Sequence, residues 1–259
     1  IHGGGMDLQF PHHESEIAQS TICNHQAPVK YWMHNNMITI NGRKMGKSYN
    51  NVIKLTEMFS GNHPLLTQAF GPMTVRFFIL QSHYRSTLDF SSEALTASEK
   101  AYKRLWDAYE TLLKLPVGEN AVAADTGLDE KINKWLAEFE EFMDDDFSTP
   151  KVLANMFEMA PVINSIKDGL IAADAISSQT LTHMKERFTS FLVDIFGLLP
   201  ADGAANETLQ AVMQLLIDIR KEAKLKKDYA TSDKIRIQLN ELGILLKDEK
   251  DGGISWSME

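Results

Sequence analysis

Beyond residue 90, apolar residues recur three and four positions apart along almost the whole chain. This spacing places them on one side of an α-helix, so it predicts a series of amphipathic helices. Thr149 followed by Pro150 is typical of a helix start, and Gly243 stands where glycine commonly ends a helix. The predicted helices are Ser92–Leu115, Leu128–Met143, Pro150–Lys167, Gln179–Phe196, Glu207–Lys226 and Tyr229–Leu242.

The first 90 residues have a mixed pattern. Ile1–Gly5 is typical of a strand end that runs into a glycine loop, and Pro11–Ile22 of a helix with proline in its first turn. Met37–Ile40 predicts a short strand before the turn Asn41–Gly42. A further helix is predicted after Pro72. Because a domain seldom starts at the end of a core strand, the chain is expected to be the second part of a longer protein.

Two stretches rich in small and polar residues predict linkers, at 116–126 and 199–206. After the last helix, Ile244–Leu246 and Ile254–Trp256 predict a short hairpin. The C-terminal part of the chain is therefore expected to be a small α+β segment.

Composition excludes several classes of protein. Apolar residues make up 44% and charged residues 24% of the 259, which is ordinary for a globular protein and excludes a disordered chain, collagen or a coiled coil. No apolar run is long enough for a membrane helix. A single cysteine, Cys23, excludes an internal disulfide and favours a cytoplasmic location. The net charge of −9 argues against a generic nucleic-acid binder, so any RNA contact must come from a local patch.

The densest group of metal-ligand side chains is His12, His13, Glu14 and Glu16. His12 and Glu16 are four residues apart, so they share one face of a helix. A histidine and a carboxylate on one face can supply two ligands of a tetrahedral zinc ion. The plainer interpretation, a polar helix face, stays open at this point.

A loop with two lysines and a serine follows the predicted turn. Lys44, Lys47 and Ser48 flank Gly46, an arrangement that suits a phosphate clamp because lysine acts as a mobile point charge. Gly3–Gly5 would let a ligand approach the backbone, and Asp7 could accept hydrogen bonds from a ribose. A solvated basic loop and an ordinary glycine turn are the alternatives.

Residues 220–236 hold seven basic and three acidic residues, a local charge of +4. Such a run is a candidate surface for phosphate backbones. It is also compatible with a solvated helix face. The basic residues are Arg220, Lys221, Lys224, Lys226, Lys227, Lys234 and Arg236.

The order of these motifs resembles cysteinyl-tRNA synthetase, a class I aminoacyl-tRNA synthetase. Residues 3–20 resemble that family's GGGxDLxFPHHENEIAQS signature, with Ser15 in place of Asn. Residues 31–34 and then 44–48 resemble its route into the KMSKS loop, with Gly46 in place of Ser. Further resemblances cover almost the whole chain: residues 76–78 and 83–86, 144–150, 227–236, 242–244 and the terminal Gly-x-x-Trp. Phe59–Gly71 is longer than usual for the family.

The resemblance implies the fold and its domains. It implies an α/β remnant, the C-terminal part of a Rossmann-like catalytic domain, over residues 1–50 with a KMSKS-type loop. A stem-contact region is then expected over 51–95, a helical bundle over 96–203 and an anticodon-binding tail over 204–259.

The resemblance also implies an activity: ATP-dependent ligation of cysteine to tRNA through cysteinyl-adenylate. ATP with Mg²⁺, cysteine and tRNA(Cys) would be the substrates of a cytoplasmic monomer. Gly5, Asp7, Lys47 and Ser48 would bind ATP, with Lys44 and Lys47 catalytic. A looser loop is expected because Gly46 lacks the usual serine.

For the metal, the resemblance implies one zinc ion that binds the thiolate of the substrate. Its ligands here would be His12 and Glu16, with two cysteines from an upstream half that also carries the HIGH motif. His13 and Glu14 would support those ligands. His2 would line the cysteine pocket. The chain alone is therefore expected to be inactive.

For the RNA, the resemblance implies that the tail reads the anticodon loop. Lys226, Lys227 and Arg236 would contact phosphates, and Trp256 would stack on an unpaired base. Two other functions stay open: a paralogous cysteine ligase that acts on an amino-sugar, and a helical module that only binds tRNA. The basic run and the terminal tryptophan favour the synthetase.

Overall fold

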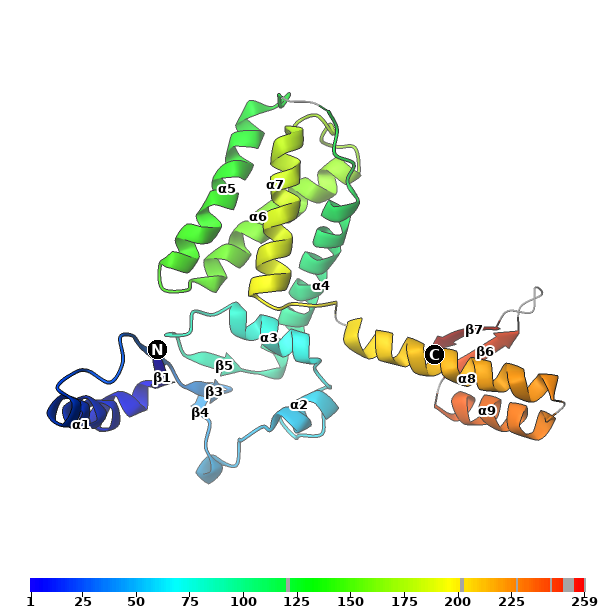
Figure 1. Cartoon of the computed structure of the whole chain (residues 1–259), viewed down its shortest axis with the longest axis horizontal. Coiled ribbons are helices and arrows are strands. Elements are labelled where there is room, and N and C mark those ends of the chain that lie inside the picture. Colours follow the sequence, from blue (N-terminus) through cyan, green and yellow to red (C-terminus); the bar gives the residue numbers. More distant parts are fainter. Residues whose placement is uncertain (120–121, 201–202, 227, 243, 249–253, 259) are drawn as a thin grey trace. The chain divides into compact units, whose positions relative to one another are not determined.

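The computed structural model describes residues 1–119, 122–200, 203–226, 228–242, 244–248 and 254–258 (Figure 1). The chain divides into two compact units, Ile1–Ala201 and Asp202–Glu259. This division lies close to the boundary expected between the bundle and the tail. The expected boundaries after residues 50 and 95 stay predictions.

The first unit begins with a two-stranded parallel sheet. Strand β1 (His2–Gly5) pairs with β2 (Trp32–Asn35), with His2 opposite Trp32 and Gly4 opposite His34. The crossover between them contains η1 (Met6–Leu8), η2 (Gln9–His13) and α1 (Glu14–Asn24). The predicted helix is therefore present, but its first turn, η2, is π-helical.

A second sheet has the strand order β4-β3-β5. Strand β3 (Ile38–Ile40) pairs antiparallel with β4 (Arg43–Lys44) and parallel with β5 (Leu88–Phe90). The tight turn between β3 and β4 has positive φ at both central residues, 51° at Asn41 and 74° at Gly42, as the Asn-Gly pair predicts.

Helices α2 (Leu55–Ser60) and α3 (Pro72–Leu80) pack against this sheet. Its core consists of buried apolar side chains from the sheet, from both helices, from the segment between these helices and from residue 95: Ile40, Met58, Phe70, Val75, Phe78, Phe90 and Leu95. The lysine loop (residues 45–51), which follows β4, is therefore connected directly to a packed part of the fold.

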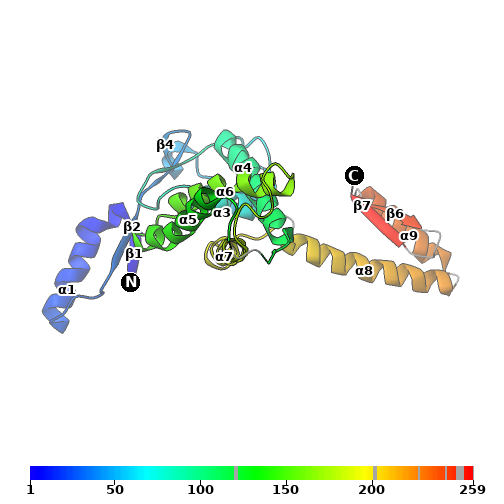
Figure 2. The same ribbon diagram turned by 90° about the horizontal axis from the view of Figure 1, so that it is seen from above.

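Four helices form a bundle in the first unit: α4 (Ser92–Lys114), α5 (Thr126–Asp144), α6 (Thr149–Lys167) and α7 (Ser178–Phe188). Figure 2 looks down on the bundle, with α7 nearly end-on. These helices agree with the predicted ones, except that Gln179–Phe196 is not one helix. After Phe188 it continues as the π-helix η4 (Thr189–Ile195).

The interior of the bundle accounts for much of the stability of the first unit. Leu105 on α4 is completely buried, whereas Leu113 on the same helix is 45% exposed. We expect Leu105→Ala to lower the free energy of unfolding by about 2–5 kcal/mol, because it leaves a cavity. Leu113→Ala should lower it by less than about 1 kcal/mol. Urea titration followed by circular dichroism measures both, and equal losses would contradict this assignment of the core.

The bundle is tied to α3 by side chains that bind free carbonyls. Thr149 Oγ1 donates to the carbonyl of Leu80 at 2.7 Å, where α3 ends. Arg76 Nε donates to the carbonyl of Phe196 at 2.5 Å, and the guanidinium lies against Gly197, where a Cβ would come within 2.8 Å of it. Gly197 also has a φ of 60°, a left-handed conformation that favours glycine.

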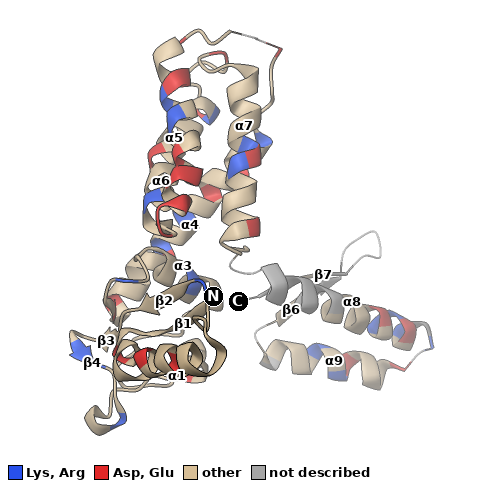
Figure 3. Ribbon diagram, turned by 60° about the vertical axis from the view of Figure 1, so that its left-hand side comes forward, with Lys and Arg blue, Asp and Glu red and all other residues tan. Residues whose placement is uncertain are grey.

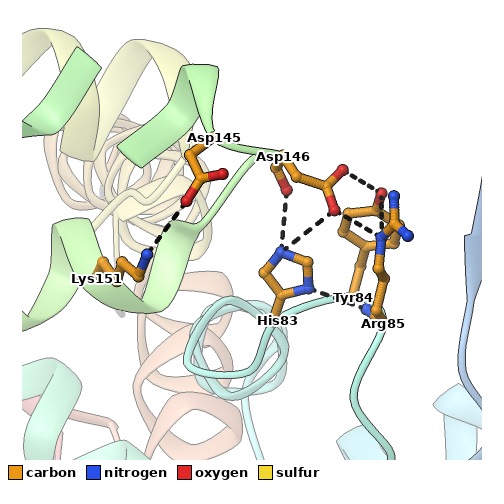
Figure 4. A network of polar contacts seen from close by, with 6 residues as sticks. All are labelled: His83, Tyr84, Arg85, Asp145, Asp146 and Lys151. Carbon is orange, nitrogen blue, oxygen red and sulfur yellow. Dashed lines mark hydrogen bonds and ion pairs between the residues drawn. The ribbon is translucent and has the colours of Figure 1, made fainter. Parts of the chain in front are cut away.

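A third tie is a polar network around Asp146, in the loop between α5 and α6 (Figure 4). The Tyr84 hydroxyl donates to Asp146 Oδ1 at 2.5 Å, and Arg85 Nε lies 2.6 Å from Asp146 Oδ2. His83 Nε2 is 3.0 Å from the Asp146 carbonyl. The hydrogen bond from Tyr84 and then the charge and hydrogen bond of Arg85 hold the pKa of Asp146 below its usual value.

This network predicts a loss of order in acid. A carboxylate with a lowered pKa stabilises the fold at pH values above its unfolded pKa of 3.8, and this contribution is lost as the pH falls through the folded pKa. We expect the protection factor of the Phe147 amide, which is its intrinsic exchange rate at each pH divided by the observed rate, to fall below about pH 4. In Asp146→Asn this protection factor should be lower already at pH 6 and should change less with pH. An unaltered profile in that variant would contradict the assignment.

The second unit contains α8 (Gly203–Leu225), α9 (Tyr229–Glu241) and the antiparallel hairpin β6 (Ile244–Asp248)–β7 (Ile254–Met258). Its described core is formed by Met213, Leu239 and Ile244, with Trp256 packed against them. The predicted hairpin is confirmed. Helix α8 starts earlier than expected, so the linker before it is shorter. Gly243, the expected helix end, lies outside the described residues.

No helix in the described part of the chain is both long and apolar enough to cross a membrane.

Candidate active site

Side chains on one face of the first sheet form a cluster of aromatic rings. Trp32 and His34 are two residues apart on β2, so their side chains leave the same face of the strand. His2 lies opposite Trp32 in the register, and their ring centroids are 4.8 Å apart. Gly4 lies opposite His34 and contributes no side chain.

The space above Gly4 is filled by His13. A Cβ at Gly4 would lie 2.9 Å from His13 Cε1, so any larger residue would displace the ring. His13 is 4% exposed, and its Nδ1 is hydrogen-bonded to His34 Nε2 at 2.8 Å. Its centroid is 4.9 Å from that of Trp32. The hydrogen bond to His34 leaves His13 Nε2 for a second partner.

Glu16 joins this cluster from the first turn of α1. Its Oε2 lies 3.4 Å from His2 Nε2. Of the His, Cys, Asp and Glu side chains that the structure describes, those of His2, His13 and Glu16 bring one ligand atom each within 4.8 Å of one another. Two imidazoles and a carboxylate are donors that suit zinc.

The structure therefore groups Glu16 with His13 rather than with the expected His12, which is exposed and not part of the group. His13 lies three residues before Glu16, at the junction of η2 and α1, and its side chain is buried toward His34 while that of His12 faces solvent. Which of the two histidines binds a metal stays a prediction. His2, expected at the cysteine pocket, is a member of the group. His34 and Trp32 were missed as site residues, because only the pairing of β1 with β2 brings them there.

The expected ATP residues lie at two places. Gly5 ends β1 and Asp7 lies in η1, and a Cβ at Gly5 would collide with the Asp7 carboxylate, so glycine allows that side chain to fold back. Lys47 and Ser48 lie in the short helix η3 (Lys47–Tyr49), after β4. Lys44, Lys47 and Ser48 are exposed, as a loop that contacts phosphates requires.

Two polar side chains hold the lysine arm (residues 38–51), which comprises β3, β4, η3 and the segments between and after them. Asp89 on β5 accepts from Thr39 Oγ1 at 2.6 Å and from the Gly42 amide at 2.7 Å, which fixes the turn between β3 and β4. Asn51 contacts the other end of the arm, at Lys44 and Gly46. Figure 3 shows the basic residues of the arm on β4.

In the tail, the structure revises the basic run. Arg220 is only 2% exposed, so it is part of the interior and not of a solvated surface. Lys226 Nζ lies 2.6 Å from Glu222 Oε1, and this carboxylate raises the pKa of Lys226. Arg236 is exposed. Lys227 lies outside the described residues.

Trp256 is half-buried and lies opposite Leu246 in the hairpin. Its packing against the core of the second unit gives it a structural role. Stacking on an unpaired base, the role expected for it, stays a prediction.

Comparisons with known proteins agree with this arrangement. Residues 1–100 match the family described as tRNA synthetases class I (C) catalytic domain, and residues 138–200 match the DALR domain. The "Cysteine--tRNA ligase" of Parabacteroides distasonis is 48% identical over 261 residues, which cover 100% of this chain and 51% of that protein. That of Bacteroides thetaiotaomicron is 51% identical over 97% of this chain and 50% of its own length.

The chain belongs to the cysteinyl-tRNA synthetase family. It spans about half the length of the curated relatives that it matches. Among solved structures, LeuRS from Agrobacterium radiobacter K84 in a ternary complex with tRNA and LeuAMS is similar over 76% of this chain and 27% of that one, with a TM-score of 0.50 and 14% identity. At that identity the likeness concerns the fold alone: an α/β remnant of a class I catalytic domain followed by helical domains.

Proposed function

We propose that the protein containing this chain attaches cysteine to tRNA in two steps. In the first, a carboxylate oxygen of cysteine forms a bond to the α-phosphorus of ATP, and the bond to pyrophosphate breaks. In the second, a hydroxyl of the tRNA 3′ end attacks the carbonyl carbon of cysteinyl-adenylate. That hydroxyl loses its proton, and AMP leaves with the bonding electrons.

The observation that supports this proposal is that one chain of this family carries two groups of side chains, each suited to a different substrate. The lysine arm offers exposed cations for a triphosphate, and the group His2, His13 and Glu16 offers donors for a metal that binds sulfur. A module that only binds tRNA would need neither.

In this mechanism Lys47 stabilises the negative charge that develops between the α- and β-phosphates. Lys44 and Ser48 hold the phosphates from the same arm, and Mg²⁺ arrives with ATP. A positioned cation acts here by electrostatic stabilisation, with no covalent step of its own. Gly5 leaves the backbone of β1 accessible, and the Asp7 carboxylate accepts hydrogen bonds from the ribose.

Zinc fits the donor set of the cluster. His13 would bind it through Nε2 while Nδ1 keeps its bond to His34, the arrangement that orients most metal-binding histidines. Glu16 would be the second ligand from this chain, with His12 as the alternative to His13, and His2 would line the site beside Glu16. Bound zinc would hold the substrate as a thiolate, a bond that the hard hydroxyl of serine forms poorly.

The experiment that tests this function uses a protein with both halves of the synthetase. Cysteine-dependent exchange of pyrophosphate into ATP should be observed, and cysteine should be transferred to tRNA. Transfer to an amino-sugar instead of tRNA would assign the paralogous ligase. Binding of tRNA without any exchange would leave only the binding module.

For the tail we predict weak tRNA binding that depends on salt. Arg236→Gln should reduce the slope of log affinity against log salt by about one unit, because one phosphate contact is lost. Lys226→Gln should reduce it by less, since Glu222 already neutralises that lysine. Both should weaken binding to all tRNAs equally. Titrations at several salt concentrations measure this slope. An unchanged slope for Arg236→Gln would show that the basic run, residues 220–236, is a solvated helix face that does not contact phosphates.

A further inference from the structure

The backbone of the lysine loop is held by one buried side chain. Asn51 is 7% exposed although it is polar and follows an exposed loop. Its Oδ1 accepts from the Gly46 amide at 2.9 Å, and its Nδ2 donates to the Lys44 carbonyl at 3.1 Å. One planar amide therefore bridges the two residues on either side of Met45.

The local chain geometry explains why Asn51 can reach back. The turn η3 closes with hydrogen bonds from the Tyr49 amide to the Gly46 carbonyl, 3.0 Å, and from the Asn50 amide to the Lys47 carbonyl, 3.1 Å. Asn50 then has a left-handed φ of 50°, which reverses the chain direction. After this reversal the side chain of Asn51 returns to the start of the loop.

Gly46 makes this contact important. Its φ of −172° is ordinary extended backbone, so the observed geometry does not require glycine. Glycine nevertheless has more conformations to lose than any other residue. The other backbone hydrogen bonds of this segment, from Met45 to Ile38 and from Tyr49 to the Gly46 carbonyl, do not involve the Gly46 amide. The two bonds of Asn51 restrict the position at which that freedom is greatest.

We propose that Asn51 is a positioning residue for the phosphate-binding loop, which fixes the Lys44–Lys47 backbone so that Lys47 meets the triphosphate in the geometry of the reaction. The proposal rests on the function proposed above. Asn51 is buried and acts through the loop, by its contacts to Gly46 and Lys44. The loop that is expected to be loose at Gly46 is thus restrained from outside the motif.

The contact itself is tested in the 259-residue chain, with no activity involved. In Asn51→Ala the Gly46 amide loses its acceptor, and we expect its hydrogen exchange to accelerate at least about tenfold. Asn155 provides a matched control: it is also a buried asparagine, 9% exposed, and it donates to the Trp135 carbonyl and to Glu138 in the bundle. Asn155→Ala should lower the free energy of global unfolding. Under conditions in which the chain stays folded, it should leave the hydrogen-exchange rate of the Gly46 amide as in wild type. Equal exchange at Gly46 in wild type and Asn51→Ala would overturn the proposal.

The function of the contact is tested in a protein with both halves. Pyrophosphate exchange in Asn51→Ala should show a kcat about 10–100-fold lower, the loss expected from a misplaced catalytic group. The KM for cysteine should stay unchanged. Asn155→Ala should lower Tm and leave kcat as in wild type. If Asn51→Ala exposes Gly46 to exchange and kcat is unchanged, the side chain is structural only and the proposal is wrong.

Two further variants separate positioning from folding. Asn51→Asp keeps an acceptor for the Gly46 amide and loses the donor to Lys44, so Gly46 should stay protected while kcat falls less than in the alanine variant. Gly46→Ser restricts the backbone, and its Cβ has room, with Tyr49 Cδ2 at 3.4 Å. Added to Asn51→Ala, it should restore part of kcat. No gain in the double variant would contradict a positioning role. Absence of pyrophosphate exchange in the wild-type protein with both halves would instead overturn the proposed function. The result of hydrogen exchange at Gly46 would be unaffected.

Discussion

Replacing Lys47 with alanine in a protein with both synthetase halves should reduce the rate of cysteinyl-adenylate formation by about 10²–10³. A preorganised group that stabilises developing charge is typically worth this much. Cysteine binding should change little, because Lys47 acts on the phosphates as the reaction proceeds and not on the amino acid. Rapid-quench measurement of adenylate gives the rate, and equilibrium binding of cysteine gives the affinity.

Lys30→Ala is a suitable control for this experiment. Lys30 is an exposed lysine of the same unit that lies before β2 in the sequence and belongs to none of the motifs named above. Its replacement changes the net charge equally and should leave the rate unaltered. An equal fall in both variants would show an effect of total charge. A fall in cysteine affinity as large as the fall in rate for Lys47→Ala would contradict a role limited to the phosphates.

The metal site gives the second large effect. We expect His13→Gln to lower zinc affinity more than about 100-fold, since replacing a residue that only supports a ligand already costs 10–100-fold. Glu16→Gln should have a comparable effect. His12→Gln should have little, because the His12 side chain is exposed and outside the group with Glu16. Competition with a chromophoric chelator measures these affinities.

The reverse result would be equally informative. A large loss in His12→Gln with none in His13→Gln would assign the ligands to His12 and Glu16, the pair expected from helical spacing. It would also show that the first turn of the helix rearranges when metal binds. His34→Gln supplies a check on orientation: it removes the partner of His13 Nδ1 at 2.8 Å and should weaken zinc binding by a smaller factor than His13→Gln.

The sequence predicted the long helices well, because each repeats its apolar spacing over many turns. Helix α4, for example, buries Leu95, Tyr102, Leu105, Tyr109 and Leu112 along one face. The short strands could not be found in the same way. Strand β4 has two residues and β5 has three, too few for an alternating pattern to appear. Their pairing depends on contacts between residues far apart in the chain.

The candidate site was predictable only in part. Gly5, Asp7, Glu16, Lys44 and Lys47 stand in motifs that sequence alone can single out. The choice between His12 and His13 could not be made from spacing, because residues three and four positions before Glu16 both lie on its face of a helix. Asn51 lies after the motif, and no pattern in the sequence shows that its amide folds back to Lys44.

The anchoring of the β3–β4 turn has a consequence for the order in which the chain folds. Asp89 holds Thr39 and Gly42 across about 50 positions of sequence, and the β3–β5 ladder spans the same distance. Contacts of such long range form late, after the intervening loop has closed. During synthesis the lysine arm therefore stays unordered until residue 90 has been made. A nascent chain that ends between Asn51 and Leu88 would contain Lys44 and Lys47 but would lack the contacts with β5 that position them.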